Sequence, residues 1–237
     1  MISFIVPSHN EECLIGGTLG ALHAAAGAMN EPYEIVVVDD ASTDGTSTVA
    51  AGWGARVLPV QHRKIGAARN AGAAQAQGDL FVFVDADTHV TAAVVLAAVH
   101  AMRVGAVGGG ARAWFDGRVP LYGRILARLW QWLQRFGHLA SGCFIFCTRP
   151  AFEAVGGFDE TLYAAEDLVL SRWLRRLGRF VILQEVVVTS GRNIRSHSAF
   201  ETLCILVGFM LRGPQFFRTR HGPWYGRRRD DPDSTAQ

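Results

Sequence analysis

Two carboxylates that could hold a divalent cation stand two residues apart, directly after an apolar run. The run at 80–84 reads Leu-Phe-Val-Phe-Val and is followed by Asp85-Ala86-Asp87. Where a buried strand ends, side chains at i and i+2 can both point into one cleft. Mg²⁺ and Mn²⁺ are commonly held by one or two carboxylates together with substrate phosphates. The triplet alone is weak evidence for such a site, because Asp-x-Asp also occurs in ordinary turns.

Two further segments rich in acidic and hydroxyl side chains follow apolar runs earlier in the chain. Residues 8–12 follow the run at 2–6, and residues 39–43 follow the run at 34–38. Both runs have the composition of buried strands. Because ligands bind beyond the carboxyl ends of the strands in a parallel sheet, these two segments and residues 85–88 are predicted to line one site.

The elements that must position these segments alternate between strand and helix patterns. The patterns predict strands at 2–6, 34–38, 55–60 and 80–84, and helices at 11–28, 42–52, 64–77 and 91–102. Ser42 or Thr43 is expected to cap the second helix, Gly78 to end the third, and Thr91 to cap the fourth. This alternation predicts an α/β fold with a Rossmann-like, mostly parallel central sheet and helices on both faces.

The alternation breaks down after residue 104. The patterns there predict strands at 106–115, 142–148, 180–183 and 186–189, and helices at 121–136, 150–155, 166–177 and 199–211. Because we find no repeat and no linker, residues 1–226 are interpreted as one domain, with a nucleotide-binding half at 1–104 and an acceptor-side half at 105–226. The charged segment 227–237 is predicted to be disordered.

Composition excludes several classes of protein. The 237 residues are 49% hydrophobic and 19% charged, which rules out collagen, coiled coils and disordered chains. The net charge of +2 creates no overall field that would attract nucleic acid, and no nucleic-acid partner is expected. The basic residues are 22 Arg and a single Lys, which we attribute to the codon bias of a GC-rich genome.

The chain is expected to act in the cytoplasm. Residues 2–7 are too short for the apolar core of a signal peptide, and the apolar runs at 90–102 and 202–211 fall short of the ~20 residues that a spanning helix needs. The cysteines lack the spacing of a zinc site and are interpreted as buried thiols in a reducing compartment. They are Cys13, Cys143, Cys147 and Cys204.

Other short motifs accompany the acidic segments in a fixed order. In chain order they are Pro7-Ser8-His9-Asn10-Glu11-Glu12, Asp39-Asp40-Ala41-Ser42-Thr43, Gly66-Ala67-Ala68-Arg69-Asn70-Ala71-Gly72, Asp85-Ala86-Asp87, Gly142-Cys143-Phe144, Gly156-Gly157-Phe158-Asp159-Glu160 and Glu166-Asp167. The ordered set resembles the family-2 glycosyltransferases, which have the GT-A fold, over about residues 1–190. The stretch Val187-Val188-Thr189-Ser190 with Arg192 resembles a bacterial subgroup of that family, of which the substrates are mostly unassigned.

The resemblance implies a metal-dependent, inverting transfer of a sugar from a nucleotide diphosphate sugar to an unidentified acceptor. Mn²⁺ or Mg²⁺ is expected on Asp87, with Asp85 beside it, where it would act as a Lewis acid on the leaving diphosphate. Asp167 matches the base that takes the acceptor proton, with Glu166 next to it. The residues expected to bind the nucleotide sugar are Pro7, Ser8, Glu11, Asp40, Arg69, Asp85, Ala86 and Arg192.

Several of these residues also have a purely structural interpretation. Asp167 could complement a helix dipole, and Arg69 could form an ion pair with Asp39 or Asp79 instead of contacting the nucleotide. Arg192 and Arg195 could clamp the diphosphate, although a solvated face is the favoured interpretation. His197 is a further candidate metal ligand, with a scattered histidine as the favoured alternative.

The helix predicted at 121–136 is basic, amphipathic and rich in tryptophan. Arg124, Arg128, Gln131 and Arg135 form one polar stripe, and apolar side chains cover most of the remainder. Such a helix can lie in a membrane interface, although packing on its own sheet or on a dimer partner is favoured. If the acceptor is linked to a lipid, residues 121–136 and 199–217 are the expected contacts with the inner face of the membrane.

The sequence lacks the motifs of competing enzyme classes. No Gly-x-Gly-x-x-Gly follows the first strand, and Lys64 is followed by Ile65 rather than by Ser or Thr. The glycine-rich, Arg-containing loop of sugar nucleotidylyltransferases and the Gly-x-Ser-x-Gly of hydrolases are also missing. The remaining alternative is a catalytically inactive module that binds nucleotide sugars or glycans, which would show metal-dependent nucleotide affinity without turnover.

Overall fold

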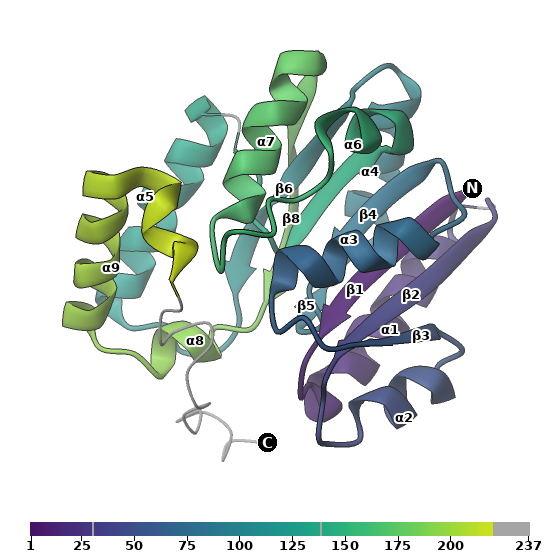
Figure 1. Cartoon of the computed structure of the whole chain (residues 1–237), viewed down its shortest axis with the longest axis horizontal. Helices are drawn as coiled ribbons and strands as arrows, with labels where there is room; N and C mark the ends of the chain where they lie inside the picture. The colour runs from purple at the N-terminus through teal and green to yellow at the C-terminus, as the bar shows by residue number, and fades with distance from the viewer. Residues whose placement is uncertain (30, 138, 220–237) are drawn as a thin grey trace.

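A sheet of eight strands forms the centre of the computed structural model, which describes residues 1–29, 31–137 and 139–219. The strand order is β3-β2-β1-β4-β7-β6-β8-β5 (Figure 1). The strands are β1 (Ile2–Ser8), β2 (Tyr33–Asp40), β3 (Arg56–Val60), β4 (Leu80–Val84), β5 (Thr88–His89), β6 (Gly108–Phe115), β7 (Phe144–Thr148) and β8 (Phe180–Thr189). The segment 227–237, for which disorder was predicted, lies outside the described residues.

The first four long strands form a parallel half-sheet. β1 pairs in parallel with both β2 and β4, and β2 pairs in parallel with β3. In this register Ser8 lies opposite Asp39, and Ile5 lies opposite Phe83. The carboxyl ends of β1, β2 and β4 therefore meet at one edge, as predicted. β2 continues through Asp39 and Asp40, which we had expected to end it.

The other half of the sheet is mixed. β7 runs antiparallel to both β4 and β6, β6 is parallel to β8, and β5 is antiparallel to β8. The two strands predicted at 180–183 and 186–189 are one strand, because a register shift opposite Gly110 and Arg112 absorbs the irregularity between them. The two-residue strand β5 was missed, since it is too short to show a period.

Helices cover both faces of the sheet, which confirms the predicted α/β architecture. Successive strand residues point to opposite faces, so Phe4 joins one hydrophobic core and Ile5 the other. The first core is covered by α1 (Glu12–Gly27), α2 (Thr46–Gly52) and α4 (Ala92–Arg103); the second by α3 (Ile65–Gln75), α6 (Arg149–Val155) and α7 (Glu166–Leu177).

Two predicted helix ends are wrong, and one is confirmed. The Thr91 hydroxyl accepts a hydrogen bond from Val94 N at 3.3 Å and caps α4 as expected. Neither Ser42 nor Thr43 caps α2, which begins at Thr46, and the N–H of Thr46 donates to Asp44 Oδ1 at 3.1 Å instead. α3 ends at Gln75, before Gly78. A Cβ at Gly78 would lie 2.7 Å from Met1 O, so this glycine permits close contact with β1 rather than ending a helix.

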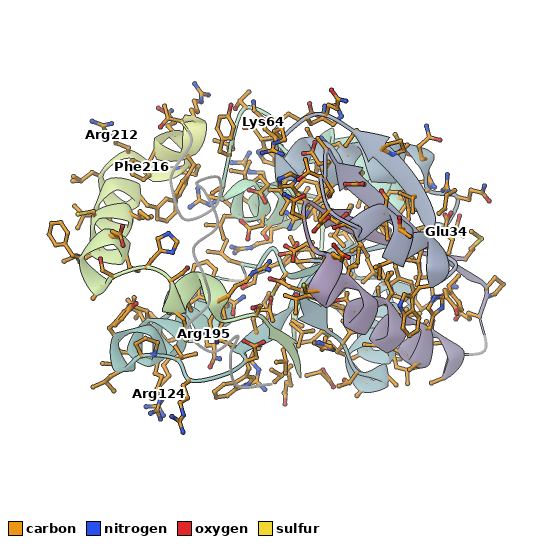
Figure 2. The ribbon with its side chains drawn as sticks, turned by 90° about the horizontal axis from the view of Figure 1, so that it is seen from below. Glu34, Lys64, Arg124, Arg195, Arg212 and Phe216 are labelled. Carbon is orange, nitrogen blue, oxygen red and sulfur yellow. The ribbon has the colours of Figure 1, made fainter. Side chains whose placement is uncertain are left out.

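The remaining helices lie at the end of the sheet away from β3, on the left in Figures 1 and 2. They are α5 (Leu121–Gly137), α8 (Arg192–Arg195), α9 (Ala199–Arg212) and the 3₁₀ helix η1 (Gly213–Arg218). Across the described ranges, none of the helices has both the length and the apolar character needed to cross a bilayer.

The cysteine prediction is half right. Cys143 and Cys147 are buried, and burial raises the pKa of both thiols. Cys13 and Cys204 are exposed, because they lie on the outer faces of α1 and α9.

Candidate active site

A cavity of about 990 Å³ opens at the carboxyl ends of β1, β2 and β4. This volume lies at the upper end of the usual range for small-molecule sites. All twelve residues proposed for the site from the sequence line it: Pro7, Ser8, Glu11, Asp40, Arg69, Asp85, Ala86, Asp87, Glu166, Asp167, Arg192 and His197. The structure thus brings together residues that are up to 190 positions apart in the chain.

Asp87 is held from the C-terminal part of the chain. The Thr189 hydroxyl donates to Asp87 Oδ1 at 3.2 Å. Arg192 Nη2 lies 3.1 Å from Asp87 Oδ2 and 2.5 Å from Glu11 Oε1. One guanidinium nitrogen therefore bridges two carboxylates of the cavity, and the interpretation of Arg192 as part of a solvated face is wrong.

Asp87 lies in a strongly acidic environment. Burial raises its pKa to about 7, Asp85 and Glu11 push the pKa in the same direction, and Arg192 opposes them. Burial is also the main reason that the pKa of Asp85 is raised. Negative charge thus exceeds the positive charge available at this point of the cavity.

Arg69 is completely buried and connects three parts of the site. Its Nη2 donates to Asp85 Oδ1 at 2.7 Å and to Gly142 O at 2.9 Å, while Nη1 lies 2.6 Å from Glu166 Oε1. The alternative interpretation, an ion pair with Asp39 or Asp79, is wrong. Burial alone would lower the pKa of Arg69, but Asp85 and Glu166 outweigh burial and raise it, so the guanidinium stays charged.

We expect Arg69→Met to destabilise the fold severely. Removing one partner of a buried ion pair typically costs about 3–5 kcal/mol, because the other charge is left uncompensated. Denaturant unfolding would measure the loss. The matched control is Arg103→Met, whose exposed pair with Glu31 should contribute less than about 1 kcal/mol. Equal effects of the two substitutions would contradict a central role for Arg69.

Asp167 begins α7 with its carboxylate beside Arg69. The carboxylate accepts hydrogen bonds from the backbone N–H groups of Leu168, at 2.8 Å, and Gly142. Burial raises its pKa to about 7, and the adjacent Glu166 carboxylate acts in the same direction. A Cβ at Gly142 would lie 3.2 Å from Asp167 Oδ2 and 3.1 Å from Arg69 Nη2. A larger residue at this position would crowd both side chains.

Three of the predicted nucleotide contacts have a structural task as well. Asp40 Oδ1 and Oδ2 accept the backbone N–H groups of Arg63 at 2.8 Å and Lys64 at 3.1 Å, which fixes the chain that enters α3. The Ser8 hydroxyl donates to Val38 O at 3.2 Å. The carbonyl of Ala86 accepts the Thr18 hydroxyl at 2.8 Å. Their contacts with a nucleotide stay predictions.

His9 and Arg63 also line the cavity and were not proposed from the sequence. His9 Nδ1 donates to the Asp40 carbonyl at 2.9 Å, so its Nε2 accepts from Arg63 Nη1 at 2.7 Å. Arg63 has a φ of 53°, and Asn10 and Ala165 share this left-handed conformation elsewhere in the cavity lining. Strained backbone of this kind clusters at functional sites. Nothing in the sequence pattern around Arg63 predicts its conformation.

The two glycine-containing motifs at 66–72 and 156–160 contact each other in the structure, and this contact gives both a structural role. Asn70 Nδ2 donates to Phe158 O at 2.9 Å, and its Oδ1 accepts Phe158 N at 2.9 Å. Gly157 has a φ of 79°, and a Cβ there would lie 2.6 Å from Asn70 Oδ1. The turn before α7 is thereby fixed against α3, next to Arg69.

The donor set of the cavity fits a hard divalent cation. Asp85 and Asp87 offer oxygen ligands, which Mg²⁺ and Mn²⁺ prefer. Within residues 1–29, 31–137 and 139–219, no three His, Cys, Asp or Glu side chains form a metal site by themselves. Substrate phosphates would have to complete the coordination. His197 lines the same cavity, and its role as a ligand stays a prediction.

Arg195 does not belong to the cavity lining. Its Nη1 donates to Asp116 O at 2.6 Å, and its side chain is only 6% exposed. The solvated-face interpretation is therefore wrong for Arg195 too, although the contact that it makes is structural.

Solved structures of glycosyltransferases share this fold. The mannosyltransferase PcManGT from Pyrobaculum calidifontis, in complex with GDP-Man and Mn²⁺, superposes with a TM-score of 0.67 at 22% identity, over 89% of this chain and 61% of that one. Glucosyl-3-phosphoglycerate synthase from Mycobacterium tuberculosis, in complex with Mn²⁺ and UDP, superposes with a TM-score of 0.58 at 21% identity. The superposition covers 93% of this chain and 81% of that one. The GT-A fold that the sequence resemblance implied is confirmed.

The sequence comparison identifies the family. The profile of the family described as glycosyl transferase family 2 matches residues 3–156, so the chain belongs to that family. An undecaprenyl-phosphate 4-deoxy-4-formamido-L-arabinose transferase of Aeromonas hydrophila is 34% identical over 94 residues, which are 37% of this chain and 29% of the relative. A dolichyl-phosphate β-glucosyltransferase of Drosophila melanogaster is 36% identical over 99 residues, 36% and 30% of the two chains. The matches span about three tenths of the length of these relatives.

Proposed function

We propose that the protein is an active, metal-dependent and inverting glycosyltransferase that uses a nucleotide diphosphate sugar as donor. The observation that carries the proposal is the convergence of Asp85, Asp87, Glu166 and Asp167 on one cavity. Membership of glycosyl transferase family 2 supports the reaction class.

The chain's own residues divide the chemistry between two sides of the cavity. On the donor side, Pro7, Glu11 and Asp40 would line the nucleoside pocket, and Asp87 with Asp85 would hold Mn²⁺ or Mg²⁺. The bound metal would supply Lewis-acid stabilisation of the leaving diphosphate. Arg192 would gain a third partner in the diphosphate, since it already lies against Asp87 and Glu11.

On the acceptor side, Asp167 would remove the proton of the acceptor hydroxyl as that oxygen attacks the anomeric carbon. The raised pKa of Asp167 makes it a better base than an ordinary aspartate at neutral pH. Glu166, held by Arg69, would fix the start of α7 so that Asp167 stays in position. A single displacement of this kind inverts the anomeric centre.

A lipid-linked acceptor and a cytoplasmic enzyme at the inner membrane face belong to the same proposal. Two relatives are named as transferases of polyprenyl phosphates, one of undecaprenyl phosphate and one of dolichyl phosphate. Apolar residues of α5 and α9, among them Trp130, Ile205 and Phe209, line the cavity and support an acceptor with an apolar part.

The proposed nucleotide and metal binding is tested by measuring the Tm of the protein in the presence of UDP, GDP, CDP or dTDP, each with Mn²⁺, Mg²⁺ or EDTA. A ligand at 100 times its Kd stabilises the folded state by about 2.7 kcal/mol, so the rise in Tm is readily measured. We expect one nucleotide to stabilise the protein only with metal. Release of that nucleotide from its sugar conjugate would then separate an enzyme from an inactive binding module. No stabilisation by any nucleotide with metal would contradict the proposal.

A further inference from the structure

Helix α5 contacts the protein through a side that carries both polar and apolar residues, and a second, apolar side of the helix faces outward. Gln134 is buried and donates through Nε2 to the Ser141 hydroxyl at 2.7 Å, and Gln131 Nε2 donates to Ala113 O at 3.2 Å. The apolar residues Leu121, Ile125, Leu129 and Trp132 are all more than half exposed. At 3.6 residues per turn they fall within an arc of about 80°. The helix does pack on its own sheet, and half-buried Leu126 and Trp130 lie on its inner side, so α5 has apolar residues on both sides.

Helix α9 has a second exposed apolar stripe. Phe200, Leu203, Val207, Met210 and Leu211 are exposed, and Met210 reaches 82%. They share one side of the helix, within an arc of about 100°. The other side carries Ile205 and Phe209, which line the cavity. Soluble surfaces rarely have two such stripes without a partner.

Arginines predominate around both stripes, and Glu201, the acidic residue of α9, forms a capping box with Ser198 at the start of that helix. α5 contains three arginines and no Asp or Glu, and its exposed Arg124 and Arg128 flank the apolar arc. Arg212 and Arg218 follow at the end of α9 and in η1, and both are exposed. Both helices lie at the left end of the molecule in Figure 2, where Arg124 and Arg212 project outward.

We propose that these exposed sides form a docking surface for an anionic phospholipid bilayer. The α5–α9 surface consists of Leu121, Ile125, Leu129 and Trp132 of α5 and Phe200, Leu203, Val207, Met210 and Leu211 of α9. A basic amphipathic helix with exposed Trp and Leu binds in the plane of an anionic interface. A second copy fits less well, because a two-fold contact would place the arginines of α5 against themselves with no acidic residue on that helix to pair with them.

Docking in this way would place the cavity directly above the lipid. Ala127 and Trp130 of α5 and Ile205 and Phe209 of α9 line the cavity from behind the α5–α9 surface. An acceptor carried by a lipid could reach Asp167 without leaving the membrane. This consequence depends on the proposed function, whereas membrane binding itself does not.

Co-sedimentation with phosphatidylcholine vesicles, with and without phosphatidylglycerol and in the absence of nucleotide, tests the surface. We expect the protein to bind only the anionic vesicles and to be released by salt. The pair Ile125→Ser/Met210→Ser should weaken binding at least about tenfold, and Arg124→Gln/Arg128→Gln about 30-fold. The matched control is Leu96→Ser/Leu177→Ser, which removes two exposed leucines from α4 and α7 and should leave binding unchanged.

Three results would overturn the inference. One is the absence of binding to anionic vesicles, and another is an equal loss in the Leu96/Leu177 control pair. The third is a dimer in light scattering that the Ile125/Met210 pair dissociates, which would identify a second copy as the partner. Because the vesicle assay contains no nucleotide, its failure leaves the proposed reaction untouched. Stabilisation by nucleotide and metal, measured on the same variants, is expected to be unchanged.

Discussion

Asp167→Asn is expected to lower kcat by about 10²–10⁴-fold while nucleotide binding stays nearly intact. This range is the usual contribution of a general base. Asparagine has the shape of aspartate, and its Oδ1 can still accept the backbone N–H of Leu168. It cannot take a proton from an acceptor hydroxyl. Initial rates of nucleotide release with saturating donor measure the effect.

The pH dependence separates a base from a structural carboxylate. Because burial raises the pKa of Asp167 to about 7, the residue is protonated and inactive as a base at lower pH. The kcat/KM of the wild type should therefore rise with pH up to about 7 and then level off, and the residual activity of Asp167→Asn should lack this rise.

Asp79→Asn serves as the control for this substitution, since the Asp79 side chain is largely exposed and lies outside the cavity lining. It should leave both kcat and the pH profile unchanged. If Asp167→Asn unfolds the protein, or if its kcat equals that of the wild type, Asp167 is a structural residue.

Asp87→Ala is expected to abolish metal-dependent nucleotide binding. The substitution removes the carboxylate that is proposed to hold the metal and leaves Asp85 paired with Arg69. The rise in Tm with nucleotide and Mn²⁺ should vanish, whereas Asp79→Ala should keep it. Persistence of the full metal-dependent rise in Asp87→Ala would exclude Asp87 as the ligand.

Replacing Asp87 by asparagine should not lower the stability of the fold at alkaline pH. The pKa of Asp87 is raised to about 7 in the folded protein, so folding favours its neutral form. The stability that this group contributes is complete below its unfolded pKa near 4 and is lost as pH rises toward 7. Above pH 7 the ionised carboxylate opposes folding. Asp87→Asn, which keeps a side-chain oxygen for Thr189, should therefore be at least as stable as the wild type at pH 8 in the absence of metal.

The positions of the acidic residues could be predicted because they depend on short-range rules. A buried parallel strand that ends in Asp85-Ala86-Asp87 places its carboxylates at the carboxyl edge, whatever the rest of the chain does. The same rule brought Glu11 and Asp40 to that edge. Asp167 was located through a family motif, since no period or spacing distinguishes it from a dipole-stabilising residue.

The partners of the buried arginines could not be predicted from the sequence. Arg69 contacts Asp85 and Glu166 because α3 and the start of α7 lie on the same face of the sheet, and the contact with Glu166 joins residues 97 positions apart. From the sequence alone, Asp39 and Asp79 were the candidate ion-pair partners of Arg69. Arg63 and His9 were missed for a similar reason, as their contact depends on a left-handed residue in a loop.

The orientation of α5 shows another limit of sequence patterns. A helical period separates a polar from an apolar side but does not say which of them faces the protein. That choice depends on Ser141, whose hydroxyl accepts hydrogen bonds from both Trp130 Nε1 at 2.9 Å and Gln134 Nε2 at 2.7 Å.

The pairing of β5 with β8 limits how this protein can be recombined with its relatives. Thr88 donates to the Thr189 hydroxyl at 2.9 Å, Thr189 donates to Asp87, and Arg192 pairs with Asp87 and Glu11. The part of the cavity around Asp87 is thus completed by a segment that follows α5 and α7 in the chain. A chimaera with a simple junction near residue 104 would combine an Asp87 from one parent with a Thr189 and an Arg192 from the other. To graft a new acceptor specificity, the exchanged piece has to end before β8, so that residues 188–192 stay with the half that is proposed to bind the nucleotide.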